Sequence, residues 1–152
     1  MSTSDLRSGP TSFSFRPGCP LARSVLAQRL VRSCPVPGAF TPTCSAKHLP
    51  GYVDKAGDLK SKGVDEIVAT AVNDAFVMAA WGEALGAEGK VRMLADPAGD
   101  FATAMGLDVD AAVLGGKRSK RFARVVEDGK VTHLEVEPDG FGLTCSLAES
   151  LL

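Results

Sequence analysis

Cys44 is the residue whose surroundings best suit chemical reactivity. It lies in the stretch VPGAFTPTCS, which runs from Val36 to Ser45, at the point where a predicted loop becomes a predicted helix. Pro42 disfavours helix just before it. The thiol should therefore face unpaired backbone N–H groups and the positive end of the helix dipole. Both features favour the thiolate, which is the nucleophilic form of cysteine. The alternative is a capped helix with an unreactive cysteine, and these residues alone leave both open.

Two nearby side chains could assist Cys44. Thr41, one turn earlier, has a hydroxyl that donates and accepts hydrogen bonds, which suits a small polar substrate with two oxygens. His48 follows four residues later, on the same face of the predicted helix. A Cys–His pair could indicate a metal site or a protease dyad. Two ligands are too few for zinc, and the sequence shows no third catalytic partner. We therefore expect no metal, and a packing or positioning role for His48.

The other cysteines and the composition exclude several classes of protein. Cys19, Cys34 and Cys145 form no CxxC pair with Cys44 or with one another, which argues against structural zinc. The 152 residues are 45% hydrophobic and 23% charged, a normal balance for one globular domain. The net charge of −1 gives no electrostatic drive toward nucleic acid or anionic membrane. No apolar run approaches the ~20 residues that a membrane helix needs.

The pattern from Val36 onward alternates helices with strands, which predicts an α/β domain with parallel strand pairs. A helix over 44–62 should be kinked at Pro50 and ended by Gly63. Asn73–Asp74 can cap the next helix, and Asp128–Gly129 is a strong hairpin signal. The other predicted elements are strands at 64–72, 91–95, 121–127 and 130–137, helices at 75–85 and 100–105, and a final helical turn at 146–152.

The spacing Pro37-x-x-x-Thr41-x-x-Cys44 resembles the active-site motif of the peroxiredoxins, and VPGAFTPTCS is typical of the peroxiredoxin-5 or type II subgroup. The resemblance runs from Val36 to the C-terminus and includes HLPGYVDKAGDLKSKGV, VNDAFVMAAWG, EGKVRMLADPAGDF, SKRFARVVEDGKV and EVEPDGFGLTCSLA. It implies a thioredoxin-like fold, a mixed sheet flanked by helices. It also implies a thioredoxin-dependent thiol peroxidase that reduces hydrogen peroxide and alkyl hydroperoxides, serves antioxidant defence and redox homeostasis, and needs no cofactor.

The same resemblance assigns roles to five residues. Cys44 matches the peroxidatic cysteine, which attacks the peroxide and becomes a sulfenic acid. Pro37 would shape and shield the loop, and Thr41 would hydrogen-bond the peroxide. Arg121 matches the active-site arginine, whose charge would stabilise the thiolate and the departing oxygen. Cys145 matches the resolving cysteine of the atypical two-cysteine subgroup. It would close an intramolecular disulfide with Cys44, and thioredoxin would then reduce that disulfide.

Two of these residues have ordinary alternatives. Without the resemblance, Arg121 belongs to a basic run with Lys117, Arg118 and Lys120, a pattern typical of a solvated loop. Cys145 lies in a glycine-rich loop and could be a bystander thiol.

The segment before Val36 departs from the family. Relatives have an apolar central strand there, whereas Arg29, Arg32 and Pro35 are poor central-strand residues. We therefore expect the first strands to be missing or replaced. Residues 1–35 should form a divergent, disordered or targeting segment, and residues 36–152 the peroxiredoxin domain. The competing hypothesis is a catalytically impaired truncated isoform that acts, if at all, as a binding or regulatory partner.

Location and assembly are expected on weaker patterns. The first 36 residues hold five arginines, no lysine and one acidic residue, a composition typical of a mitochondrial targeting segment. The final residues Glu149–Leu152 do not match a peroxisomal address. We expect a mitochondrial or cytoplasmic protein, monomeric or weakly dimeric.

Overall fold

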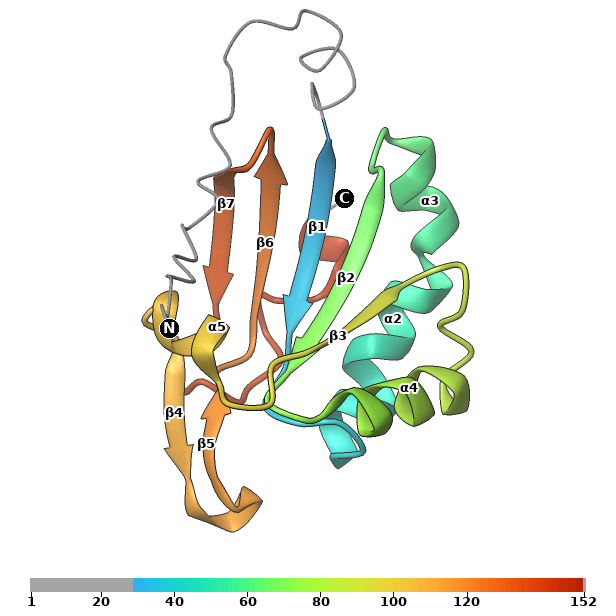
Figure 1. Ribbon diagram of the computed structural model, residues 1–152. Helices are drawn as coiled ribbons and strands as arrows, with labels where there is room; N and C mark the ends of the chain where they lie inside the picture. The colour runs from blue at the N-terminus through green and yellow to red at the C-terminus, as the bar shows by residue number, and fades with distance from the viewer. Residues whose placement is uncertain (1–28, 152) are drawn as a thin grey trace, which may run out of the picture.

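The computed structural model describes residues 29–151, which fold around one five-stranded sheet (Figure 1). The strand order is β3-β2-β1-β6-β7. The three strands β1, β2 and β3 are parallel, whereas β6 and β7 are antiparallel to their neighbours, so the sheet is mixed as predicted. The bounds are Leu30–Pro35 for β1, Glu66–Ala71 for β2, Arg92–Ala95 for β3, Phe122–Glu127 for β6 and Lys130–Val136 for β7.

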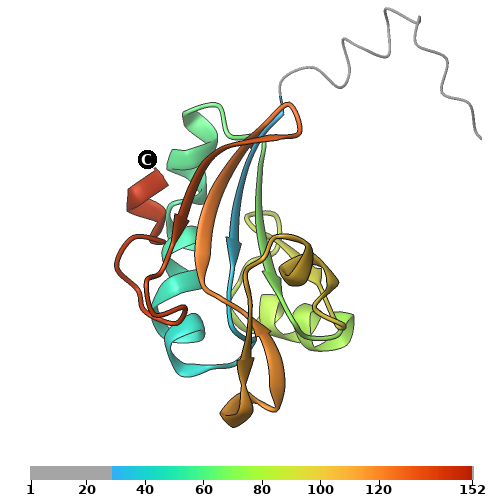
Figure 2. The same ribbon diagram turned by 90° about the vertical axis from the view of Figure 1, so that its left-hand side faces the viewer.

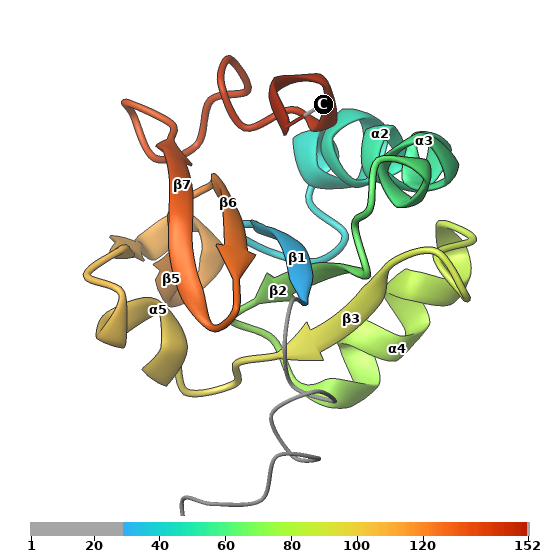
Figure 3. The same cartoon turned by 90° about the horizontal axis from the view of Figure 1, so that it is seen from above.

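Helices cover both faces of this sheet (Figures 2 and 3). One face carries α2, α3 and the C-terminal turn η3, and the other carries α4 and α5. The core lies mainly under α2 and α3, where Leu49, Tyr52 and Leu59 are fully buried. The bounds are Leu49–Asp54 for α2, Ala56–Ser61 for α3, Ala75–Ala84 for α4, Asp100–Ala104 for α5 and Ala148–Leu151 for η3.

The expectation of a missing central strand is wrong. Residues 30–35 form β1, which lies in the middle of the sheet between β2 and β6. Pro35 is tolerated because pairing with β6 ends at Ser33, so its absent N–H removes no bond on that side. Arg32 is tolerated because its side chain is only partly buried. The folded unit therefore extends ahead of the expected boundary at Val36.

Residues 1–28 lie outside the described residues. They include Cys19 and most of the segment expected to act in targeting. Within the described part, no helix is both long and apolar enough to cross a bilayer.

Local signals explain most of the other elements. The side chain of Asp74 accepts a hydrogen bond from Val77 N at 2.9 Å, which confirms the predicted cap of α4. Asp128 and Gly129 both have positive φ and join β6 to β7, as the hairpin signal predicted. The long helix predicted at 44–62 is instead three short segments. Proline at position 50 cannot donate to the preceding turn, and a π-helical turn, η1 (Cys44–His48), occurs just ahead of it.

A small second sheet was not predicted. Strands β4 (Asp108–Ala111) and β5 (Gly116–Ser119) pair antiparallel around the turn η2 (Ala112–Leu114). The strands have four residues each and carry charged and glycine residues, so they lack an alternating apolar pattern.

Candidate active site

Cys44 is placed by the loop that leaves β1. Pro42 and Thr43 already have helical backbone, so Cys44 lies within the first helical turn rather than at its junction with the loop. Proline suits this position because the first N–H groups of a helix have no partner in the helix. The Cys44 side chain is 1% exposed. A buried sulfur in a first turn can be reached only by a small reactant or after the turn moves.

Arg121 supplies a positive charge to this sulfur. Its Nη2 lies 3.3 Å from Cys44 Sγ, within hydrogen-bond distance. The guanidinium is 2% exposed and is fixed by Nε, which donates to Phe141 O at 3.2 Å. Its Nη1 is buried without a partner among the described residues, so one donor beside the sulfur is unused. A buried cation at this distance stabilises a thiolate and any negative charge that develops next to it.

Thr41 and Pro37 lie in the loop that leads from β1 to the Cys44 turn. The Thr41 hydroxyl donates to Gly38 O at 2.9 Å, which leaves its oxygen able to accept another hydrogen bond. A Cβ on Gly38 would lie 3.2 Å from Thr41 Cγ2, so glycine lets the loop fold tightly onto this side chain. Pro37, in the same loop, is buried. The structure thus holds Thr41 in the Cys44 loop, with its hydroxyl hydrogen directed to Gly38.

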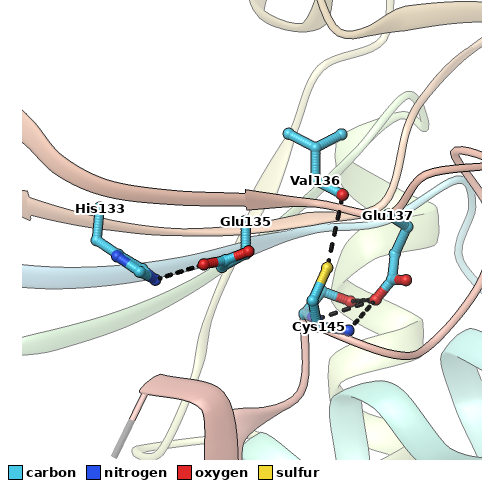
Figure 4. Close-up of polar contacts among 6 residues, drawn as sticks. His133, Glu135, Val136, Glu137 and Cys145 are labelled. Atoms are coloured by element: carbon cyan, nitrogen blue, oxygen red, sulfur yellow. Dashed lines mark hydrogen bonds and ion pairs between the residues drawn. The ribbon is translucent and has the colours of Figure 1, made fainter.

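Cys145 is near this region but is not bonded to Cys44. It lies in the loop between β7 and η3, and its Sγ is 3.5 Å from Val136 O (Figure 4). Cys34, Cys44 and Cys145 are all free thiols. Burial, and then the negative charge of Glu137, raise the pKa of Cys145. Burial raises the pKa of Cys34 to about 12, so this β1 side chain stays a neutral thiol.

Glu137 is a functional candidate that the sequence did not reveal. It directly follows β7, is 1% exposed and points its carboxylate at the Cys145 loop (Figure 4). Burial alone would raise the pKa of this carboxyl, but hydrogen bonds from Ser146 and Thr144 outweigh burial and lower it to about 2. Its only sequence signal is an acidic residue ahead of a Pro-Asp-Gly turn, and such residues are usually solvated.

His48 and Tyr52 connect the Cys44 helix to the same loop. Nε2 of His48 lies 2.8 Å from Ser146 O, and Tyr52 OH donates to that oxygen at 2.9 Å. A carbonyl oxygen only accepts hydrogen bonds, so His48 Nε2 carries the proton. Burial lowers the pKa of His48 to about 4, which keeps the ring neutral near pH 7. These contacts support the expected positioning role of His48. Among residues 29–151, no cluster of three His, Cys, Asp or Glu groups could hold a metal ion.

Comparisons with known proteins agree on one family. Residues 31–152 match the Redoxin family. The chain is 50% identical to Peroxiredoxin-2B of Arabidopsis thaliana over 118 residues. This alignment covers 77% of this chain and 72% of that protein. It is 46% identical to Peroxiredoxin-2D of the same plant over 130 residues, or 85% and 80% of the two chains.

Solved structures show the same relationship. Reduced Prx3 from Vibrio vulnificus in complex with hydrogen peroxide aligns with a TM-score of 0.78 at 49% identity, covering 86% of this chain and 83% of that one. Peroxiredoxin 5 from Alvinella pompejana aligns with a TM-score of 0.68 at 39% identity, over 79% and 78% of the chains.

The fold is thioredoxin-like and the chain belongs to the peroxiredoxin family. Its members are thiol peroxidases, that is, oxidoreductases with an antioxidant function. The family implies peroxide substrates and a thioredoxin-type reductant.

Proposed function

We propose that this chain reduces hydrogen peroxide and alkyl hydroperoxides through Cys44, with Cys145 of the same chain as the resolving thiol and thioredoxin as the reductant. The contact between Arg121 Nη2 and Cys44 Sγ carries this proposal. It places a buried cation where a thiolate and a departing oxygen both need one. The Vibrio vulnificus Prx3 structure with hydrogen peroxide supports the choice of substrate.

The first step is attack of the Cys44 thiolate on one peroxide oxygen. An S–O bond forms, the O–O bond breaks, and the departing oxygen leaves as water or an alcohol once it gains a proton. Arg121 stabilises the charge on that oxygen, and its unpartnered Nη1 is the donor available for it. Thr41 would turn its hydroxyl from Gly38 to the bound peroxide. Cys44 is then a sulfenic acid.

The second step joins the two cysteines. The Cys145 sulfur attacks the sulfenic sulfur, the S–S bond forms, and the oxygen leaves with the Cys145 proton as water. A reduced thioredoxin dithiol then exchanges with this disulfide, which restores both thiols and leaves thioredoxin oxidised.

Mass spectrometry after one equivalent of hydrogen peroxide tests the proposal. We expect loss of two hydrogens, mapped to a Cys44–Cys145 bond. Cys44→Ser should abolish turnover. Cys145→Ser should permit one oxidation of Cys44 but no recycling by thioredoxin. Cys34→Ser is the matched control, because this thiol is buried and neutral, and it should turn over normally. Normal cycling by the Cys145 variant would mean that another thiol resolves.

The hypothesis of an impaired truncated form rested on an absent central strand, and β1 fills that position. We therefore favour the active enzyme. A mitochondrial or cytoplasmic location and a monomer or weak homodimer remain our proposals. Imaging of a C-terminally tagged chain tests the first, and sedimentation equilibrium tests the second.

A further inference from the structure

The Glu137 carboxylate gathers five hydrogen bonds from three consecutive residues. Its Oε1 accepts from the backbone N–H of Thr144, Cys145 and Ser146 at 2.8, 3.0 and 2.9 Å. The Ser146 hydroxyl donates to Oε1 at 2.6 Å, and the Thr144 hydroxyl donates to Oε2 at 2.6 Å. The middle residue of this segment is the cysteine assigned to resolution.

A buried charge with this set of donors has a specific structural effect. Burying a carboxylate is costly unless hydrogen bonds satisfy it, and bonds to a charged acceptor are about twice as strong as neutral ones. All five bonds come from 144–146. A Cβ on Gly142 would lie 3.3 Å from Oε2, so the intervening loop also packs closely on the carboxylate. Glu137 therefore fixes the backbone on both sides of the Cys145 thiol.

The Cys44 segment is attached to the same place by weaker bonds. His48 Nε2 and Tyr52 OH both donate to Ser146 O, and His48 ends the π-helical turn that starts at Cys44. Such turns are rare and occur often at functional sites. The two bonds that attach this turn to Ser146 O are neutral, whereas charge-assisted bonds hold Cys145, so this attachment is the easier of the two to break.

We propose that Glu137 is the positioning residue for disulfide closure, and that it holds Cys145 as the fixed partner to which oxidised Cys44 moves. This inference rests on the proposed function. The Cys44 turn leaves Ser146 O, its sulfenic sulfur meets the Cys145 sulfur, and closure releases water as described above. Among the described residues, the Glu137 carboxylate makes no hydrogen bond to Cys44, to Thr41 or to the Arg121 guanidinium, so its loss should affect the attack on peroxide far less than disulfide closure.

The test separates the two steps in three variants. Glu137→Gln keeps the shape and the Oε1 acceptor but removes the charge, and Glu137→Ala removes the acceptor entirely. Glu135→Gln is the matched control, because this carboxylate lies on β7 two residues before Glu137, is half-exposed and pairs with His133 at 3.2 Å instead (Figure 4). Rapid quenching with a thiol-alkylating reagent, followed by mass spectrometry, measures Cys44 oxidation and Cys44–Cys145 closure in each.

We expect Cys44 oxidation to stay within about twofold of the wild type in all variants. Closure should slow by roughly tenfold to a hundredfold in Glu137→Ala, less in Glu137→Gln, and not at all in Glu135→Gln. Excess peroxide should then convert more Cys44 to sulfinic acid in the Glu137 variants. A purely structural role would lower the melting temperature without changing the ratio of the two rates.

If Glu137 acted only through its negative charge and not through positioning, removing that charge should speed disulfide closure instead of slowing it. Loss of the Glu137 charge lowers the pKa of Cys145, and a greater thiolate fraction would speed closure. Faster or unchanged closure in folded Glu137→Gln overturns the inference. If the wild type forms no Cys44–Cys145 bond, the proposed function fails instead, so the two failures are distinct.

Discussion

Arg121 Nη2 lies 3.3 Å from Cys44 Sγ, although the two residues are 77 positions apart in the chain. The contact depends on two loops that meet at one end of the sheet. Cys44 follows β1, and Arg121 immediately precedes β6, its antiparallel neighbour. Because β1 ends where β6 begins, the strand pairing itself brings the charge to the sulfur.

The Arg121 charge should account for much of the rate of attack on peroxide. Arg121→Met keeps the volume but removes the charge, and we expect the second-order rate constant to fall by about a hundredfold or more. Arg121→Lys keeps the charge without the planar fork and should fall less. Stopped-flow tryptophan fluorescence measures this rate. Lys117→Met, an exposed cation in the same run, should have no effect. An equal loss in that control would implicate general electrostatics.

The Thr41 hydroxyl should contribute through a hydrogen bond that the peroxide makes. We expect Thr41→Val to slow Cys44 oxidation by about tenfold to a hundredfold, the value of one hydrogen bond to a charged group. Thr41→Ser keeps the hydroxyl and should remain near wild type. The same stopped-flow assay applies. If the serine variant is as slow as the valine variant, a hydroxyl at this position is not sufficient, and the Thr41 methyl group is required as well.

Acid should weaken the fold through His48. Burial lowers the pKa of His48 to about 4, below its ordinary 6.5, so between these values the unfolded chain binds the proton and the folded chain does not. Stability therefore falls as pH decreases from 6.5 toward 4, by about 3 kcal/mol in total. Glu137 adds a loss only below pH 4.5, because hydrogen bonds lower its pKa to about 2.

Urea unfolding at several pH values checks the His48 prediction. His48→Gln cannot titrate, so its free energy of unfolding should change much less between pH 6.5 and 4.5. Parallel curves for the variant and the wild type would show that other groups cause the acid sensitivity.

Arg32 should be a net cost to stability. Its Nε is buried without a partner among the described residues, and burial lowers its pKa. We expect Arg32→Leu to raise the free energy of unfolding by about 1 kcal/mol, since it removes an unsatisfied donor from the central strand. Urea unfolding at pH 7 measures the change. A loss of stability would indicate that attraction between Arg32 and the Glu127 carboxylate outweighs the burial cost.

Much of the fold could be predicted because its signals are local. The capping residue Asp74, the Asp128–Gly129 turn and the apolar β2 run each act on their immediate neighbours. The central strand β1 was missed because the charge of Arg32 and the ring of Pro35 violate the usual pattern. Both residues are tolerated because of where they lie in the sheet. The Arg32 side chain is partly exposed, and Pro35 lies beyond the point where pairing with β6 ends. Neither fact is visible without the sheet.

The site was predictable only in part. Cys44 and Thr41 share one short motif, and the family resemblance added Pro37, Arg121 and Cys145. Glu137, Tyr52 and Ser146 were missed because their partners lie far away in sequence or in an irregular loop. The bond from Tyr52 to Ser146, for example, spans 94 positions. No spacing rule connects residues at such separations.

The strand order has a consequence for biosynthesis. β1 is synthesised before its partner strands. Leu30 of β1 pairs with Glu127 of β6, so the pairing of these two strands cannot form until residue 127 has been made. Contacts between such distant segments form slowly. The ribosome must therefore release nearly the whole domain before Arg121 can reach Cys44, and a nascent or prematurely ended chain would expose this thiol without its cation. The pair of Cys44 and Arg121 is therefore complete only late in synthesis, after most of the domain has been made.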